Sequence, residues 1–165
     1  MKVIISAGGT GGHIYPALAI INKIKEMEPK SEFLYIGTHN RMEKDIVPKQ
    51  GIPYLGIDMQ GLNRKHIFKN IKVLLKTYKN IKFLKKKIKE FNPDIVIGVA
   101  GYVTLPVIYA SYKLGYKTFI HEQNLIPGMT NKFLAKKVDK IGVSLKMATA
   151  GASRRFTTTT PCPTS

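Results

Sequence analysis

Short apolar runs alternate with longer segments of helical spacing along most of the chain. The apolar runs are rich in β-branched residues and are bounded by Gly, Pro or Asp, so they predict buried strands. These strands are Val3–Ala7, Phe33–Ile36, Tyr54–Ile57, Ile95–Val99, Thr118–His121 and Ile141–Val143. The segments between them predict helices at Ala17–Met27, Arg41–Gln50, Ile67–Phe91, Leu105–Leu114 and Met129–Lys136. Alternating strands and helices indicate right-handed βαβ units, so the predicted fold class is α/β, a Rossmann-like sandwich around a parallel sheet.

Polar and glycine-rich loops follow the predicted strands at their carboxyl ends. Ligands of parallel α/β sheets bind at that edge, which makes these loops the candidate site. In chain order they read AGGTGGH, GTHNR, MQGLNR, AGYVTLP and HEQNLIPG. Most of them contain more polar or glycine residues than a connection requires, and we therefore expect a ligand that contacts several loops.

The first loop is the richest in glycine. Residues 7–16 read AGGTGGHIYP, and a helix is expected to begin near His13 or Ile14, with Pro16 in its first turn. Glycine allows a tight backbone path, and the free amides at a helix N-terminus favour an anion. The loop thus predicts a phosphate or pyrophosphate cradle, and a tight turn that only packs against a neighbouring loop is the alternative.

Two common nucleotide motifs do not fit this loop. The dinucleotide pattern G-x-G-x-x-G fails because Ile14 stands in place of the last glycine, and no acidic residue follows the second strand. No Lys-Ser or Lys-Thr pair completes a P-loop. An NAD dehydrogenase or a P-loop nucleotidase is therefore disfavoured, and measurable affinity for NAD or ATP would revive such a nucleotide-binding Rossmann enzyme.

The charge balance adds a second feature to this picture. The 165 residues include 27 Lys and Arg but only 10 Asp and Glu, a formal net charge of +17, which favours polyanionic partners. The chain enters a strand pattern at once, and no apolar run reaches the roughly 20 residues of a membrane span, so a cytoplasmic location is expected. The single cysteine, Cys162, permits no internal disulfide.

Basic residues concentrate in one predicted helix. Between Arg64 and Lys89 the chain has many lysines and no acid, with apolar residues interleaved at helical spacing. Such a basic amphipathic helix is typical of a membrane-surface element, and a core-facing stripe with a solvated lysine face is the alternative. The cations expected to face the membrane are Lys72, Lys76, Lys79 and Lys82. No groove-reading motif or aromatic platform indicates nucleic-acid binding.

The isolated acidic residues and the C-terminal segment provide no further candidate catalytic or metal site. Glu43, Asp45 and Asp58 are interpreted as surface charges, and no cluster has the spacing of a metal site. From Lys146 onward the chain lacks apolar periodicity and acidic residues, which indicates a disordered tail. We therefore divide the chain into a Rossmann-like domain, residues 1–144, and an atypical tail, residues 145–165.

Several motifs in series resemble one known family. GGTGGH followed by YPALA, then RMEKDIVPKQGI, QGLNR, PDIVIGVAGYVTLP and HEQNLIPGMTNKFLAKKVDKI resemble the N-terminal domain of the MurG family of peptidoglycan glycosyltransferases. The resemblance covers residues 1–144 and implies the acceptor half of a two-domain GT-B fold. It further implies inverting transfer of GlcNAc from UDP-GlcNAc to the MurNAc 4-hydroxyl of undecaprenyl-pyrophosphoryl-MurNAc-pentapeptide. No cofactor is implied, and the expected location is peripheral, at the cytoplasmic face of the cell membrane.

The sequence also departs from the family's pattern. Ala100 replaces the first glycine of the family's Gly-Gly-Tyr turn, and nothing after Ser144 resembles the family's interdomain region or its donor domain. Transfer by this chain alone is therefore not expected. A non-catalytic module that binds a pyrophosphoryl lipid or an anionic membrane remains the alternative function.

Inverting transfer requires a general base, and two residues are candidates. His13 stands at a helix start, where the dipole disfavours the charged imidazole and leaves it able to accept a proton. Glu122 is the rival base; each has a structural alternative, a hydrogen bond to the loop or substrate for His13 and an ion pair for Glu122. The resemblance implies contacts with the UDP-sugar for Thr10, Gly11, Gly12 and Asn124. Gly101 and Tyr102 are expected to form a second substrate-binding turn that faces the phosphates. His121 is interpreted as a structural residue at a strand end.

Overall fold

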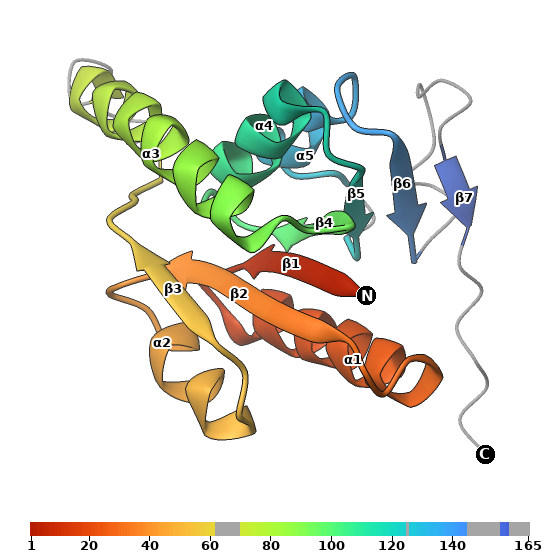
Figure 1. Cartoon of the computed structure of the whole chain (residues 1–165). Coiled ribbons are helices and arrows are strands. Elements are labelled where there is room, and N and C mark those ends of the chain that lie inside the picture. The colour runs from red at the N-terminus through yellow and green to blue at the C-terminus, as the bar shows by residue number, and fades with distance from the viewer. Residues whose placement is uncertain (62–69, 125, 145–155, 159–165) are drawn as a thin grey trace.

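The computed structural model describes residues 1–61, 70–124, 126–144 and 156–158 (Figure 1). Within these residues one parallel sheet has the strand order β3-β2-β1-β4-β5-β6-β7. The strands are β1 Lys2–Ala7, β2 Glu32–Thr38, β3 Tyr54–Ile57, β4 Ile95–Ala100, β5 Thr118–Glu122, β6 Lys140–Val143 and β7 Phe156–Thr158. The predicted Rossmann-like α/β fold class is confirmed.

Helices cover both faces of this sheet (Figure 1). They are α1 Gly11–Met27, α2 Glu43–Ile46, the 3-10 helix η1 Pro48–Gln50, α3 Asn70–Phe91, α4 Thr104–Leu114 and α5 Met129–Leu134. Side chains alternate along β1, so that Val3 and Ile5 pack with α1, whereas Ile4 packs with Leu84 of α3 and Val107 of α4. Two apolar cores therefore lie back to back, with α1 and α2 on one face and α3, α4 and α5 on the other.

Two helical segments differ from their predicted form. The helix expected at Arg41–Gln50 is divided into α2 and η1, which ends at Gly51 in the left-handed region (φ +68). The first helix begins at Gly11, earlier than predicted, so Pro16 lies in its second turn. The predicted start of the basic helix at Ile67 and the LNR part of the QGLNR loop lie outside the described residues.

The tail contains a strand where the sequence predicts irregular chain. Residues 156–158, Phe-Thr-Thr, pair in parallel with β6, and the rest of residues 145–165 lies outside the described part. β6 offers an edge, and aromatic and β-branched residues suit such an edge. The division into two segments at residue 144 stays a prediction.

Candidate functional site

The loops after β1 and β4 meet where the strand order reverses, the usual ligand position in such sheets. The Gly8 amide donates to the Ala100 carbonyl oxygen at 3.3 Å, and Ala100 itself is buried. A Cβ on Gly101, whose φ is +94, would collide with the Gly8 carbonyl oxygen. The Tyr102 ring lies beside Gly9, within 4.0 Å of where a Cβ of Gly9 would stand. The structure thus brings the predicted glycine loop and the Gly101–Tyr102 turn together.

The N-terminus of α1 opens onto this junction. Thr10 is its N-cap in extended backbone (φ −145, ψ 158), and its side chain makes no capping hydrogen bond. The first amides of a helix have no carbonyl partner within the helix, which applies here to Gly11 and Gly12. Exposed Gly12 and Thr10 therefore present the donors and the positive dipole end that suit a phosphate.

His13 lies in the first turn of α1 with one ring nitrogen engaged. Its Nδ1 is 2.9 Å from the Gly8 carbonyl oxygen. Because a carbonyl can only accept, Nδ1 carries the hydrogen in the neutral ring, and Nε2 keeps its lone pair. A half-buried imidazole in this tautomer is able to take a proton through Nε2.

The loop after β5 is tied to the first turn of α1. Pro16 has no amide hydrogen, so the Gly12 carbonyl lacks the donor that a helix normally supplies four residues later. Gln123 fills this gap, with its Nε2 donating to the Gly12 oxygen at 3.2 Å. Gln123 was not among the predicted site residues, although a proline four residues after Gly12 indicates a carbonyl that needs a donor from elsewhere. This bond brings the HEQN segment to the same edge as the glycine loop.

Glu122 is buried, and both of its carboxylate oxygens are occupied. Oε1 accepts from the backbone amide and the Nδ2 of Asn124, each at 2.9 Å. Oε2 accepts from the Gly128 amide at 3.0 Å and from Asn131 Nδ2 at 2.9 Å. The partners are neutral amides rather than the Lys or Arg considered for a structural carboxylate. This geometry favours Glu122 as the residue that shapes the loop, and it favours His13 as the base.

The same contacts indicate which side-chain atoms of Asn124 and His121 are engaged. The exposed Asn124 side chain donates from Nδ2 to Glu122, and its Oδ1 is left as an acceptor for a ligand hydroxyl or amide. His121 Nε2 is 3.2 Å from Ser144 Oγ, and burial lowers the pKa of His121. A neutral ring held at a strand end agrees with the structural interpretation of His121.

The buried position of Glu43 shows that its predicted surface location was wrong. Its side chain is fully buried, whereas the sequence analysis placed it on the surface with Asp45 and Asp58, which are exposed. Glu43 Oε1 accepts from the Thr38 amide at 3.1 Å and the Thr38 hydroxyl at 2.7 Å, and Oε2 accepts from the Gly9 amide at 3.3 Å. Its spacing from the apolar Ile46 and Val47, three and four residues on, was a signal that it faces inward.

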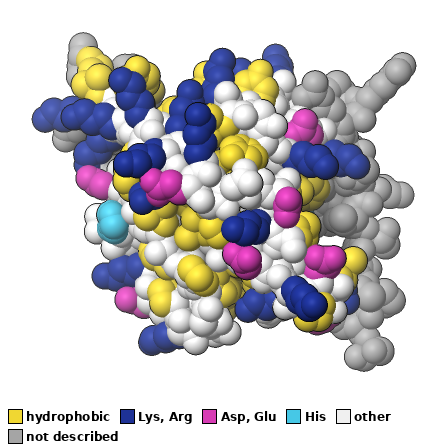
Figure 2. All heavy atoms as spheres, viewed as in Figure 1, with side chains coloured by type: hydrophobic (Ala, Val, Ile, Leu, Met, Phe, Trp, Pro, Cys, Tyr) yellow, Lys and Arg dark blue, Asp and Glu magenta, His cyan; other side chains and the backbone are white. Residues whose placement is uncertain are grey.

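The basic helix α3 carries an exposed apolar stripe that the sequence analysis did not separate from the core-facing residues. Ile71, Leu74, Leu75 and Tyr78 are 58 to 61% exposed and follow an i, i+3, i+4, i+7 spacing. The core-facing side of α3 consists instead of residues such as Leu84 and Ile88. Figure 2 shows hydrophobic and basic side chains gathered over the first part of α3. We call Ile71, Leu74, Leu75 and Tyr78 the α3 apolar stripe.

The four lysines predicted to face the membrane differ in exposure and in ion pairing. Lys72, Lys79 and Lys82 are exposed, and the Lys82 Nζ lies 5.1 Å from the centre of the Tyr78 ring. Lys76 pairs with Asp58 at 2.7 Å, so its charge is partly neutralised. Among the described residues, no helix is both long and apolar enough to cross a bilayer.

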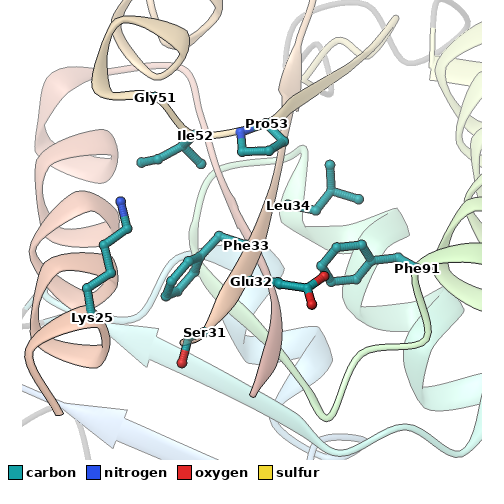
Figure 3. A pocket seen from close by; sticks show the side chains of 9 residues that line it. All are labelled: Lys25, Ser31, Glu32, Phe33, Leu34, Gly51, Ile52, Pro53 and Phe91. Carbon is teal, nitrogen blue, oxygen red and sulfur yellow. The ribbon is translucent and has the colours of Figure 1, made fainter. Parts of the chain in front are cut away.

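A pocket of about 400 Å³ lies at the opposite edge of the sheet (Figure 3). Lys25 of α1, Glu32 and Phe33 at the start of β2, and Phe91 at the end of α3 contribute to its lining. These positions mark the amino ends of the strands, away from the edge where ligands of parallel sheets bind. The pocket contains none of the predicted site residues.

The strand order, the two helical layers and the loops at the carboxyl edge form a Rossmann-like α/β domain, and solved glycosyltransferases contain the same fold. The crystal structure of MurG from Acinetobacter baumannii superposes with a TM-score of 0.83 at 28% identity, covering 99% of this chain and 46% of that chain. An apo lipopolysaccharide outer core galactosyltransferase, WaaB, shares the fold with a TM-score of 0.67 at 20% identity, over 95% of this chain and 44% of that chain.

Residues 3–143 match the glycosyltransferase family 28 N-terminal domain, and the chain belongs to that family. The UDP-N-acetylglucosamine--N-acetylmuramyl-(pentapeptide) pyrophosphoryl-undecaprenol N-acetylglucosamine transferase of Bacillus cytotoxicus is 52% identical over 148 residues, 90% of this chain. A second such transferase, from Bacillus thuringiensis strain Al Hakam, is 53% identical over the same length. The chain spans 41% of the length of each of these relatives. The resemblance to the MurG family is confirmed.

Proposed function

We propose that this chain is the acceptor-binding half of an inverting glycosyltransferase of peptidoglycan synthesis. The intact enzyme moves GlcNAc from UDP-GlcNAc to the MurNAc 4-hydroxyl of undecaprenyl-pyrophosphoryl-MurNAc-pentapeptide. The observation that carries the proposal is the His13 ring, held through Nδ1 at the N-terminus of α1, with no hydrogen-bond partner for Nε2 among the described residues. The names of relatives at 52 and 53% identity support the choice of donor and acceptor.

Three of the loops have a role in this reaction. The amides of Gly11 and Gly12 and the Thr10 hydroxyl stabilise phosphate charge at the positive end of α1. Gly101 and Tyr102 form a second turn facing the phosphates. Asn124 Oδ1 accepts from a hydroxyl or amide group of the sugar nucleotide, which reaches this edge from the donor side of the cleft.

The chemical step follows from the tautomer of His13. The acceptor 4-hydroxyl oxygen attacks the anomeric carbon of GlcNAc, the bond to UDP breaks, and the configuration at that carbon inverts. His13 Nε2 takes the hydroxyl proton as the new bond forms. The resulting imidazolium is stabilised by its Nδ1 hydrogen bond to Gly8.

A transfer assay separates this enzyme from a non-catalytic module. Labelled UDP-GlcNAc and the lipid-linked acceptor are incubated with this chain and, separately, with the intact two-domain enzyme. We expect the chain to bind the acceptor saturably without turnover, and the intact enzyme to label it. An intact enzyme that binds the acceptor but transfers nothing would favour the module that only binds a pyrophosphoryl lipid or membrane.

We further propose that the α3 apolar stripe and its lysines rest on the cytoplasmic, anionic face of the cell membrane. α3 follows β3, so its first turns lie near the carboxyl edge that carries the site loops. Each exposed lysine contributes about 1 kcal/mol near an anionic leaflet, and each buried leucine about 1.5 to 3 kcal/mol. This placement brings the pyrophosphate of a lipid acceptor to the level of the loops.

The double variant Leu74→Ser, Leu75→Ser should bind anionic vesicles at least about tenfold more weakly, because two apolar side chains no longer enter the headgroup region. Co-sedimentation with vesicles of varied anionic lipid content measures the effect. Met27→Ser is the matched control, since Met27 is 74% exposed on α1, across the sheet from α3, and should change nothing. Vesicle binding that ignores both anionic lipid and salt would refute the proposal.

A further inference from the structure

Glu43 is a buried carboxylate to which the proposed reaction gives no role. Burying a charge is costly unless good hydrogen bonds compensate it. In the described part of the chain its hydrogen-bond donors are three neutral groups, the amide and hydroxyl of Thr38 and the amide of Gly9. These bonds hold Glu43 between the end of β2 and the glycine loop, directly behind the candidate site.

The Gly9 amide belongs to the same peptide unit as the Gly8 carbonyl. In a trans peptide the N–H and the C=O point in opposite directions. The N–H of this unit donates to Glu43 Oε2 at 3.3 Å, and its C=O accepts from His13 Nδ1 at 2.9 Å. One planar group therefore connects the carboxylate on its inner side with the imidazole on its outer side. Hydrogen bonds in such a chain polarise and strengthen one another.

The backbone around the Glu43 side chain is packed so closely that Gly8 and Gly37 have no space for a Cβ. A Cβ on Gly8 would stand 2.5 Å from Glu43 Oε1, and a Cβ on Gly37 would stand 2.8 Å from Glu43 Cγ. The buried Tyr35 hydroxyl donates to the Ala7 carbonyl at 3.1 Å, just before the loop. Burial, and secondarily the Glu43 charge, raises the pKa of Tyr35.

We propose that Glu43 is a positioning residue for His13 and acts through the Gly8–Gly9 peptide. It fixes the orientation of that peptide, and the polarised Gly8 carbonyl then holds the Nδ1–H tautomer that leaves Nε2 free. What His13 does with Nε2 rests on the proposed function, whereas the link from Glu43 to His13 does not. Glutamine cannot replace Glu43, because its amide has one acceptor and would turn a donor toward either Gly9 or Thr38.

NMR of the chain labelled with ¹³C and ¹⁵N tests the link without any substrate. In the wild type we expect a downfield Gly9 amide proton, a coupling across the hydrogen bond from the Gly9 nitrogen to the Glu43 carboxylate carbon, and a His13 ring mainly in the Nδ1–H tautomer. In Glu43→Gln the Gly9 resonance should move upfield, and the tautomer ratio should fall by roughly tenfold, as loss of a hydrogen bond to a charged group permits. Asp45→Asn, the same change at an exposed carboxylate of α2, is the matched control and should leave both signals in place.

Two further measurements keep the proposal open to refutation. If Glu43→Gln does not fold, Thr38→Val, which removes one donor to Oε1, should shift the same signals in the same direction by less. In the intact enzyme, Glu43→Gln should lower kcat at a nearly constant acceptor KM. Absence of the Gly9–Glu43 coupling in the wild type, or an unchanged His13 tautomer in a folded Glu43→Gln variant, would overturn the link. Altered NMR signals with unchanged kcat would leave the link standing and contradict His13 as the base.

Discussion

Replacing His13 with alanine should lower kcat of the intact enzyme about 10²- to 10⁴-fold, the range that a positioned general base contributes. The Gly8 carbonyl holds the ring so that Nε2 is the available acceptor, and no second free base lies in this turn of α1. Glu122 does not substitute, because four amide donors occupy its oxygens. Steady-state kinetics with labelled UDP-GlcNAc measures the loss.

The control for this variant is His39→Ala, which removes an exposed imidazole from the loop after β2. Acceptor affinity should stay nearly constant in His13→Ala, because the phosphate donors are backbone amides that the substitution leaves in place. Normal turnover in His13→Ala would rule out His13 as the base. A large rise in acceptor KM at constant kcat would instead assign His13 to substrate binding.

Gly101→Ala should destabilise the domain by about 3 kcal/mol. Its φ of +94 costs a residue with a Cβ roughly 1 to 2 kcal/mol, and the collision with the Gly8 carbonyl adds a packing cost of about 1 to 3 kcal/mol. Urea unfolding of the variant and the wild type gives the difference. The same collision should displace the Gly8–Gly9 peptide and so weaken acceptor binding.

Gly115→Ala is the matched control for the backbone part of that cost. Gly115 ends α4 with a φ of +78, but a Cβ there would meet no atom within 4 Å. It should cost about 1 kcal/mol and leave acceptor binding unchanged. Equal losses of stability in the two variants would show that the Gly101 contact with Gly8 carries no energy.

Local sequence patterns predicted most of this fold. The β-branched runs place the strands to within one or two residues because short buried strands of a parallel sheet are apolar on both faces. The rule for the carboxyl edge then grouped the glycine loop, the Gly101 turn and the HEQN loop, and the structure joins them through Gly8 with Ala100 and Gly12 with Gln123.

The remaining features depend on partners that are distant in sequence. The spacing of Glu43 from Ile46 and Val47 indicates an inward side chain, but nothing near it in the sequence shows that Thr38 and Gly9 supply its hydrogen-bond donors. The α3 apolar stripe resembled core-facing residues, because helical spacing indicates an apolar face without saying whether a neighbour covers it. Strand β7 forms at the edge of β6, which the irregular composition of the tail did not reveal.

We propose above all that the carboxyl edge of the sheet binds a sugar acceptor through its pyrophosphate. The most direct test is a map of amide chemical shifts in this chain during titration with a short-chain, water-soluble pyrophosphoryl-MurNAc-pentapeptide. We predict saturable shifts centred on residues 9–13 and on Gly101 and Tyr102. Shifts confined to the opposite edge, around Lys25 and Phe91, or no shifts at saturating ligand, would contradict the claim.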